Sequence, residues 1–220
     1  MIVAVEIEAV ISKYGTAETT ENIGNMEVLT FKMPAYELIL IHSGVGELGA
    51  AAACQLLITY YGCEMVVNFG VVGGLTEEMT LAKTCIVDKV VHYDFDLSGI
   101  DPVQPAQYPE LKDEYIPSDR KLFEMVRTLR PDLKSVICAS ADKFISSAET
   151  KKQLHERYHA DICEMEAAGI ALTCFRNNIP CLMIKCVSDA ISGGAEEYMK
   201  EVLNSSKVCL DVLDEILEKL

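Results

Sequence analysis

Residues 181–189 read Cys-Leu-Met-Ile-Lys-Cys-Val-Ser-Asp, and this stretch decides the fold. The short run at 181–187 is apolar and partly β-branched, which predicts a strand buried inside a sheet. Ser188 and Asp189 follow directly, and in open α/β sheets the ligand crevice lies outside the carboxyl ends of the strands. Asp189 is therefore a candidate catalytic acid, although an aspartate before Ala-Ile-Ser-Gly-Gly is equally typical of a turn or helix cap.

Similar runs elsewhere predict the remaining strands, and helical patterns lie between them. Alternating strands and helices are typical of an α/β layer fold with a mixed sheet. With no linker or repeat, residues 1–220 are expected to form a single domain. The predicted strands are residues 2–5, 26–31, 37–41, 65–69, 84–90, 135–139 and 181–187, and the predicted helices are residues 47–61, 117–130 (with Ser118 as N-cap), 165–177 and 196–220.

The composition excludes several classes of partner. The chain carries 34 acidic residues against 19 Lys plus Arg, a formal charge of -15. Such a surface repels phosphate backbones and anionic lipids, so we expect no nucleic acid and no membrane as partner. Nine scattered cysteines without a C-x-x-C pair, and an opening without a basic, then apolar signal region, favour a soluble cytoplasmic protein with reduced thiols.

Two glycine-rich segments follow predicted strands. Residues 44–46 (Gly-Val-Gly) and 70–74 (Gly-Val-Val-Gly-Gly) allow a ligand to approach the backbone closely, but taken alone they are more typical of simple tight turns. Neither matches a dinucleotide or P-loop fingerprint. All five arginines lie at or after Arg120, so both turns lack the usual planar partner of a bound phosphate.

Glu164-Met165-Glu166 is the most unusual acidic motif. Acids at the start of a helix are favourable electrostatically, which is one explanation. The apolar company of Cys163 and Met165 indicates instead that the carboxylates point inward, where they need donors such as ribose hydroxyls. The clusters His92–Asp96 and His155/His159 do not match a specific metal pattern, so no metal and no cofactor are expected.

Taken in order, these motifs resemble the nucleoside phosphorylase superfamily, with the greatest likeness to bacterial methylthioadenosine/S-adenosylhomocysteine nucleosidases. The resemblance runs almost end to end and implies a three-layer α/β fold, with helices flanking a mixed central sheet, and a homodimer. Its motifs are residues 4–8 (Ala-Val-Glu-Ile-Glu), 43–46 (Ser-Gly-Val-Gly), 68–75 (Asn-Phe-Gly-Val-Val-Gly-Gly-Leu), 140–145 (Ser-Ala-Asp-Lys-Phe-Ile), 163–168 (Cys-Glu-Met-Glu-Ala-Ala) and 187–189 (Val-Ser-Asp).

The resemblance also implies catalytic roles. Asp189 would protonate N7 of a purine base with support from Ser188, and Glu8 would position or deprotonate the attacking water, with Glu6 as its rival. Phe144 would stack on the base, whose edge the backbone at Phe144-Ile145 would read. Met165 and Glu166 would hold the ribose, and Val45 would line the pocket for the 5′ substituent. The expected substrate-binding residues are Phe144, Ile145, Glu164, Met165, Glu166, Val45, Val71, Val72, Gly73 and Lys185.

The sequence departs from this pattern at several positions. Val71-Val72 stand where Ser-Ala is common, Lys185 stands where an arginine is frequent, and residues 191–194 form a shorter lid. The predicted reaction is hydrolysis of the N-glycosidic bond of a purine nucleoside such as 5′-methylthioadenosine or S-adenosylhomocysteine, releasing adenine. Two alternatives remain open: a phosphate-dependent phosphorylase, and a non-catalytic nucleoside-binding protein of the same fold.

Overall fold

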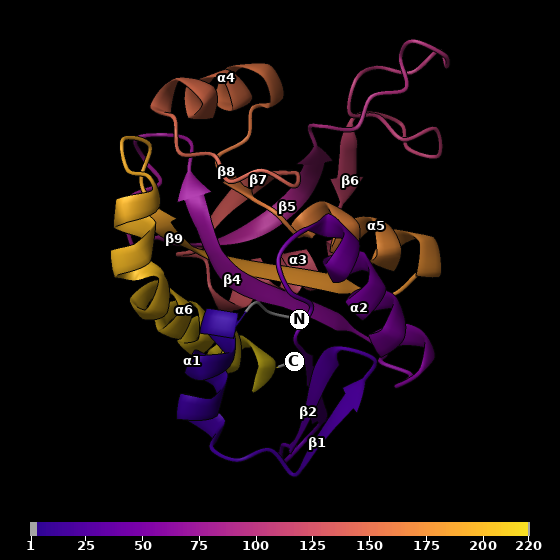
Figure 1. The fold of residues 1–220 in the computed structure, drawn as a ribbon, viewed down its shortest axis with the longest axis vertical. Coiled ribbons are helices and arrows are strands. Elements are labelled where there is room, and N and C mark those ends of the chain that lie inside the picture. The colour runs from indigo at the N-terminus through magenta and orange to yellow at the C-terminus, as the bar shows by residue number, and fades with distance from the viewer. Residues whose placement is uncertain (1–3, 220) are drawn as a thin grey trace.

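The computed structural model describes residues 4–219, which alternate between strands and helices (Figure 1). The helices are α1 (Ala4–Tyr14), α2 (Glu47–Thr59), α3 (Arg120–Leu129), α4 (Ala148–Tyr158), α5 (Ala167–Asn177) and α6 (Ala195–Leu217). The strands are β1 (Thr19–Ile23), β2 (Met26–Lys32), β3 (Glu37–Ile41), β4 (Val66–Gly74), β5 (Thr84–His92), β6 (Tyr115–Pro117), β7 (Lys134–Ser140), β8 (Ile162–Glu164) and β9 (Cys181–Asp189).

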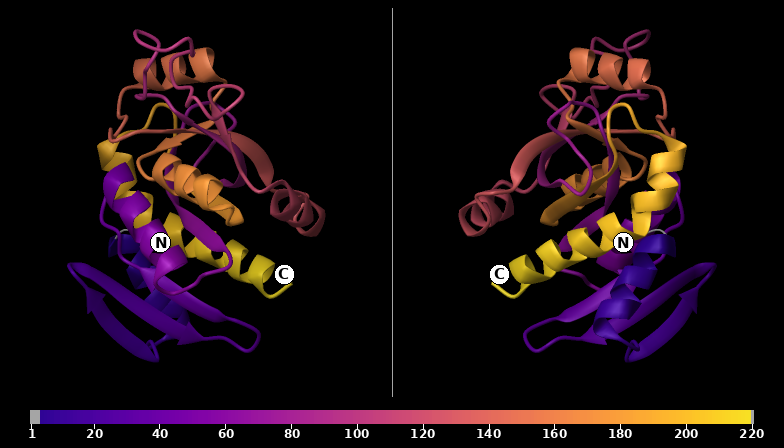
Figure 2. Two further views of the ribbon diagram at one scale, coloured as in Figure 1. Left: turned by 90° about the vertical axis from the view of Figure 1, so that its right-hand side faces the viewer. Right: turned by 90° about the vertical axis from the view of Figure 1, so that its left-hand side faces the viewer.

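The main sheet has six strands in the order β6-β5-β7-β8-β4-β9. It is mixed, because β4 runs parallel to β9 and antiparallel to β8. The first half of β5 also pairs with β9, so the sheet curls back on itself. Strands β1, β2 and β3 form a separate antiparallel sheet at the lower end of the molecule (Figure 2). The predicted α/β class with a mixed central sheet flanked by helices is confirmed.

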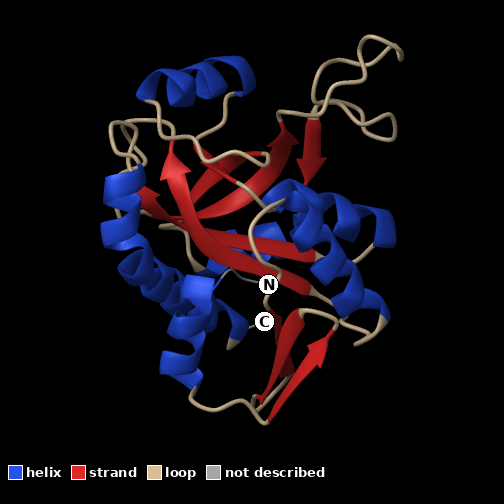
Figure 3. Ribbon diagram, in the orientation of Figure 1, coloured by secondary structure: helices blue, strands red, loops and turns tan. Residues whose placement is uncertain are grey.

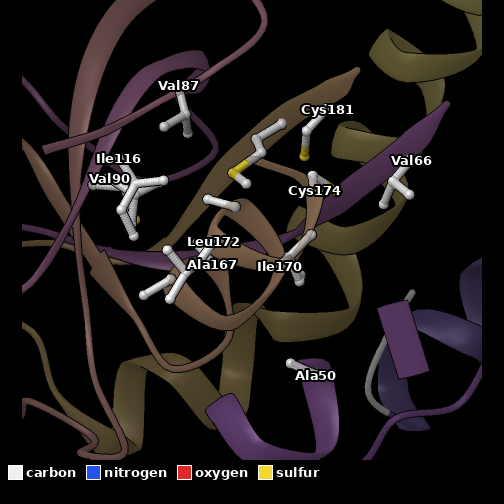
Figure 4. Close-up of a cluster of buried hydrophobic side chains, with 14 of the residues drawn as sticks. Ala50, Val66, Val87, Val90, Ile116, Ala167, Ile170, Leu172, Cys174 and Cys181 are labelled. Carbon is white, nitrogen blue, oxygen red and sulfur yellow. The ribbon is translucent and has the colours of Figure 1, made fainter. Parts of the chain in front are cut away.

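Helices cover the main sheet from both sides (Figure 3). This cover explains why the sequence of β9 is so apolar. All nine residues of β9 are buried. Leu182 and Ile184 belong to the hydrophobic cluster that includes α1 and α6. Cys181 and Met183 belong to the cluster built with α2 and α5 (Figure 4). A strand covered on both faces shows an unbroken apolar run in place of strict alternation.

The predicted first strand is not what the structure shows. Residues 2 and 3 lie outside the described part of the chain, while Ala4 and Val5 begin α1. A short apolar run cannot by itself distinguish a strand from the start of a helix. Downstream, the buried residues Ala9 and Val10 lie three and four positions after Glu6, which is the spacing of one helix face.

Other differences concern boundaries and short elements. Residues 70–74 continue β4 and do not form a turn. The N-cap of α3 is Asp119, whose carboxylate accepts a hydrogen bond from Leu122 N at 2.8 Å, while the Ser118 hydroxyl donates to Val87 O at 2.8 Å. The elements β1, β6, β8 and α4 were not predicted: the strands are short or exposed, and α4 buries three residues only.

The described residues show three further properties of the chain. Within residues 4–219, no helix has both the length and the apolar composition needed to cross a bilayer. No group of three His, Cys, Asp or Glu side chains in that range is arranged to hold a metal ion. All nine cysteines are free thiols, and all of them except Cys63 are buried.

Candidate active site

The strands β4 and β9 end side by side against the antiparallel strand β8, and this junction defines the centre of the site. Gly73 of β4 lies opposite Asp189 of β9 on one side and opposite Cys163 of β8 on the other. A Cβ atom at Gly73 would lie 3.1 Å from both the Asp189 carboxylate and the Cys163 sulfur. The absence of a side chain at Gly73 therefore leaves room for the carboxylate between the strands.

A small cavity of about 90 Å³ opens at these strand ends. Ten of the residues predicted for the site line it, together with three that were not on that list, Glu6, Cys163 and Tyr198. A larger cleft of about 770 Å³ lies elsewhere, between β3, β4 and α6, and its lining is mostly apolar. We place the chemistry in the smaller cavity because four carboxyl groups converge there. Its lining consists of Glu6, Val45, Val71, Val72, Gly73, Phe144, Cys163, Glu164, Met165, Glu166, Ser188, Asp189 and Tyr198.

Asp189 is buried at this cavity with both carboxylate oxygens engaged. The Ser188 hydroxyl donates to Oδ1 at 3.2 Å, and the Lys151 ammonium donates to Oδ2 at 2.6 Å. Lys151 also donates to Ala190 O at 2.7 Å. It comes from α4 and is completely buried, so the acid is held from two sides.

Of the two glutamates of α1, the structure places Glu6 at the cavity and Glu8 outside it. Glu6 is buried, lines the cavity and accepts a hydrogen bond from Val71 N at 3.1 Å. Glu8 is exposed and lies outside the cavity. Two residues along a helix correspond to a rotation of about 200°, so only one of the pair can face the site. The expectation that Glu8 lies in the site is therefore wrong, and its rival Glu6 is the residue found there.

Glu164 lines the cavity, but its oxygens serve mainly to cap α5. They accept hydrogen bonds from the backbone N–H groups of Glu166 at 3.2 Å and Ala167 at 2.9 Å. Lys185 donates to the same carboxylate at 3.1 Å. Lys185 is buried behind the cavity and does not line it, in contrast to its predicted role in substrate binding. Although burial favours its neutral form, Glu164 raises the pKa of Lys185 above its usual range, so Lys185 is a cation.

Two further glutamates lie close to Glu164. The Glu166 carboxylate accepts a hydrogen bond from Gly46 N at 2.8 Å, and Glu47 is bonded to the Ser140 hydroxyl and to Gly169 N. Burial, together with the charge of Glu164, raises the pKa of Glu166 to about 7 and that of Glu47 to about 8. The cluster of buried carboxyl groups therefore carries less negative charge near neutral pH than its number of glutamates suggests.

Aromatic and apolar side chains surround the mouth of the cavity. Phe144 is 46% exposed and Val45 is 67% exposed, which is unusual for such side chains. The ring of Phe144 meets that of Tyr198 edge to face, with centroids 5.4 Å apart. Ile145, predicted beside Phe144, packs against the cluster around Leu154 and does not line the cavity. This mouth can accept a flat aromatic ligand.

Two residues at the site that the sequence interpretation missed, Lys151 and Tyr198, come from the helices α4 and α6. Glu6 of α1 was named only as the rival of Glu8. A signal existed for Lys151, because Leu154 and Tyr158 follow it at three and seven positions and form one buried stripe. A lysine in such a stripe is exceptional and marks a buried partner.

The fold and the acidic cavity together are those of a nucleoside-cleaving class of enzyme, and comparison with known families identifies it. Residues 3–220 match the model of the Phosphorylase superfamily, and the chain belongs to that family. It is 28% identical over 194 residues to the aminodeoxyfutalosine nucleosidase of Campylobacter jejuni, covering 86% of this chain and 84% of that protein. It is also 28% identical over 212 residues to a 5′-methylthioadenosine/S-adenosylhomocysteine nucleosidase of Staphylococcus aureus, covering 94% and 93% of the two chains.

A solved structure supports the same fold. The Helicobacter pylori 5′-methylthioadenosine/S-adenosylhomocysteine nucleosidase matches with a TM-score of 0.92 at 22% identity, covering 99% of this chain and 95% of that one. The resemblance inferred from the motifs is confirmed, and so is the enzyme class, an N-glycosyl hydrolase of the phosphorylase superfamily.

Proposed function

We propose that this chain hydrolyses the N-glycosidic bond of an adenine nucleoside with a modified 5′ position and releases adenine. 5′-Methylthioadenosine and S-adenosylhomocysteine are the first substrates to test. Aminodeoxyfutalosine is the third, because the Campylobacter jejuni relative is named for it. The observation that carries the proposal is the convergence of Glu6, Glu166 and Asp189 on one small cavity.

The charge distribution of the cavity suits the reaction. Breaking the bond builds positive charge on the sugar, as in glycoside hydrolysis, and negative charge on the departing base. Carboxylates beside the ribose stabilise that positive charge. We assign this task to Glu166, with Met165 as the apolar contact of the sugar, because both line the cavity next to the start of α5.

The departing base needs a proton, and Asp189 is the proposed donor. The buried acid stands between Ser188 and Lys151, which fix both of its oxygens. Protonation makes the leaving group neutral, an effect worth about 10²–10⁴-fold in rate. Phe144 would stack on the base, and Tyr198 would close the mouth beside it.

Water is a better nucleophile than phosphate for this cavity. Among the described residues that line it, none is Lys, Arg or His, while four are acidic. The two buried cations nearby are already bonded, Lys151 to Asp189 and Lys185 to Glu164. A dianionic phosphate would therefore meet repulsion, whereas Glu6 can accept a proton from a neutral water molecule.

The decisive experiment is a nucleoside panel, with and without inorganic phosphate, in which the released base and sugar are identified. We expect adenine and the free sugar at rates independent of phosphate. Turnover that strictly requires phosphate and yields a sugar 1-phosphate would identify a phosphorylase. Binding by calorimetry without any release of base would identify a non-catalytic nucleoside-binding protein.

The two glutamates of α1 provide a matched pair of variants. Glu6→Gln keeps the side-chain shape but removes the proton acceptor, so we expect kcat to fall at least about tenfold. Glu8→Gln changes an exposed side chain and should leave kcat within about twofold of the wild type. Steady-state release of adenine measures both. The reverse pattern, with Glu8→Gln impaired and Glu6→Gln active, would remove Glu6 from the mechanism.

A further inference from the structure

We propose that Lys151 is a positioning residue that orients the Asp189 carboxyl group and stabilises the carboxylate that forms when Asp189 gives up its proton. The role rests on the proposed function, in which Asp189 is the acid for the leaving base. Its basis is geometric: Lys151 Nζ lies 2.6 Å from Asp189 Oδ2 and 2.7 Å from Ala190 O. The ammonium group thus donates hydrogen bonds both to the acid and to the backbone carbonyl of the next residue.

The placement of Lys151 in α4 points to this task. The buried side of α4 consists of Lys151, Leu154 and Tyr158, and the residues between them are largely exposed. An apolar residue at position 151 would complete this stripe at no electrostatic cost. Burying an ammonium group instead is strongly unfavourable unless a partner compensates for the lost hydration. Asp189 is the one carboxylate among the described residues with which Lys151 forms an ion pair.

The groups packed around the pair do not replace this cation. From β8, burial raises the pKa of the Cys163 thiol to about 12, so it is neutral. From α6, burial raises the pKa of Tyr198, which is also neutral, and the Glu197 carboxylate accepts a hydrogen bond from Ala190 N at 2.6 Å. Across the cavity, Glu6 and Glu166 are acidic. Lys151 is thus the positive charge that the described structure places against Asp189.

The chemical consequence follows from the direction of proton transfer. As the glycosidic bond breaks, the proton moves from Asp189 to a nitrogen of the base, and a carboxylate remains. An ammonium group already in contact with the carboxylate stabilises that product state. Lys151 contacts Oδ2 and Ser188 contacts Oδ1, so the orientation of the acid is fixed at both oxygens.

The test compares Lys151→Met, Lys151→Arg and, as a control, Lys152→Met on the exposed side of α4. In Lys151→Met we expect kcat to fall about tenfold or more and KM to change little. Lys151→Arg keeps the positive charge and should keep most of the wild-type kcat, and Lys152→Met should match the wild type.

A second readout does not depend on turnover. The carboxyl carbon NMR signal of Asp189, assigned by its absence in Asp189→Asn, should change its chemical shift in Lys151→Met, because the hydrogen bond from the ammonium group is lost. If no nucleoside is cleaved but this shift occurs, the proposed function fails while the pairing stands. If kcat and the NMR signal of Asp189 are unchanged in a folded Lys151→Met, as judged by thermal unfolding, Lys151 only anchors α4 and the proposal is overturned.

Discussion

Asp189→Asn is expected to lower kcat by at least about 10²-fold while nucleoside binding changes much less. The substitution preserves the size of the side chain and removes the transferable proton. An asparagine oxygen can still accept the hydrogen bond from Lys151, which lies 2.6 Å from the carboxylate in the wild type. The site should therefore stay assembled and still bind its ligand. Single-turnover release of adenine, combined with calorimetric binding of the same nucleoside, separates the two effects.

Ser188→Ala serves as the graded comparison for this variant. Ser188 donates to Asp189 Oδ1 at 3.2 Å, so its loss should loosen the acid without removing the proton. We expect a smaller reduction in kcat than for Asp189→Asn. Unchanged turnover in a correctly folded Asp189→Asn would exclude Asp189 as the acid and would leave the site without its proposed proton donor.

The parts of the site that the sequence predicts lie at the ends of apolar strands. The run at 181–187 is apolar, which predicts a buried strand with Ser188 and Asp189 at its carboxyl end. The structure shows this strand buried from end to end. Glu164 and Glu166 were expected to point inward for a similar reason, because their apolar neighbours Cys163 and Met165 belong to the same motif. Local pattern and strand-end position are enough for these residues.

The remaining parts depend on helix rotation and on packing between distant segments. Choosing between Glu6 and Glu8 requires knowing that residues 4–14 form a helix, because in a strand both side chains would lie on the same face. Lys151 reaches Asp189 across 38 positions of sequence. Lys185 sits in an apolar strand, and its ammonium group contacts Glu164 and does not line the cavity. Sequence spacing does not encode such contacts.

Lys185→Met should lower the free energy of unfolding by about 3–5 kcal/mol, the range for breaking a buried ion pair by removing one partner. Lys185 is 2% exposed and lies 3.1 Å from Glu164, which is itself buried. Without the cation, Glu164 would face the neighbouring acids Glu47 and Glu166 uncompensated. Urea unfolding followed by far-UV circular dichroism, extrapolated to water, measures the loss.

The double variant Lys185→Met/Glu164→Gln decides whether the loss comes from charge or from packing. The Glu164→Gln change removes the orphaned charge, and the amide oxygen it introduces can still accept hydrogen bonds from the start of α5, where Glu164 receives them from Glu166 N and Ala167 N. If charge dominates, the double variant should recover most of the stability that Lys185→Met loses, because replacing both partners of a buried pair is often close to neutral. If the double variant is as unstable as the single one, the methylene chain of Lys185 fills space that Met does not. The three neighbouring glutamates, Glu47, Glu164 and Glu166, would then need no buried cation beside them. The raised pKa values of Glu47 and Glu166 would alone keep the charge of this group low near neutral pH.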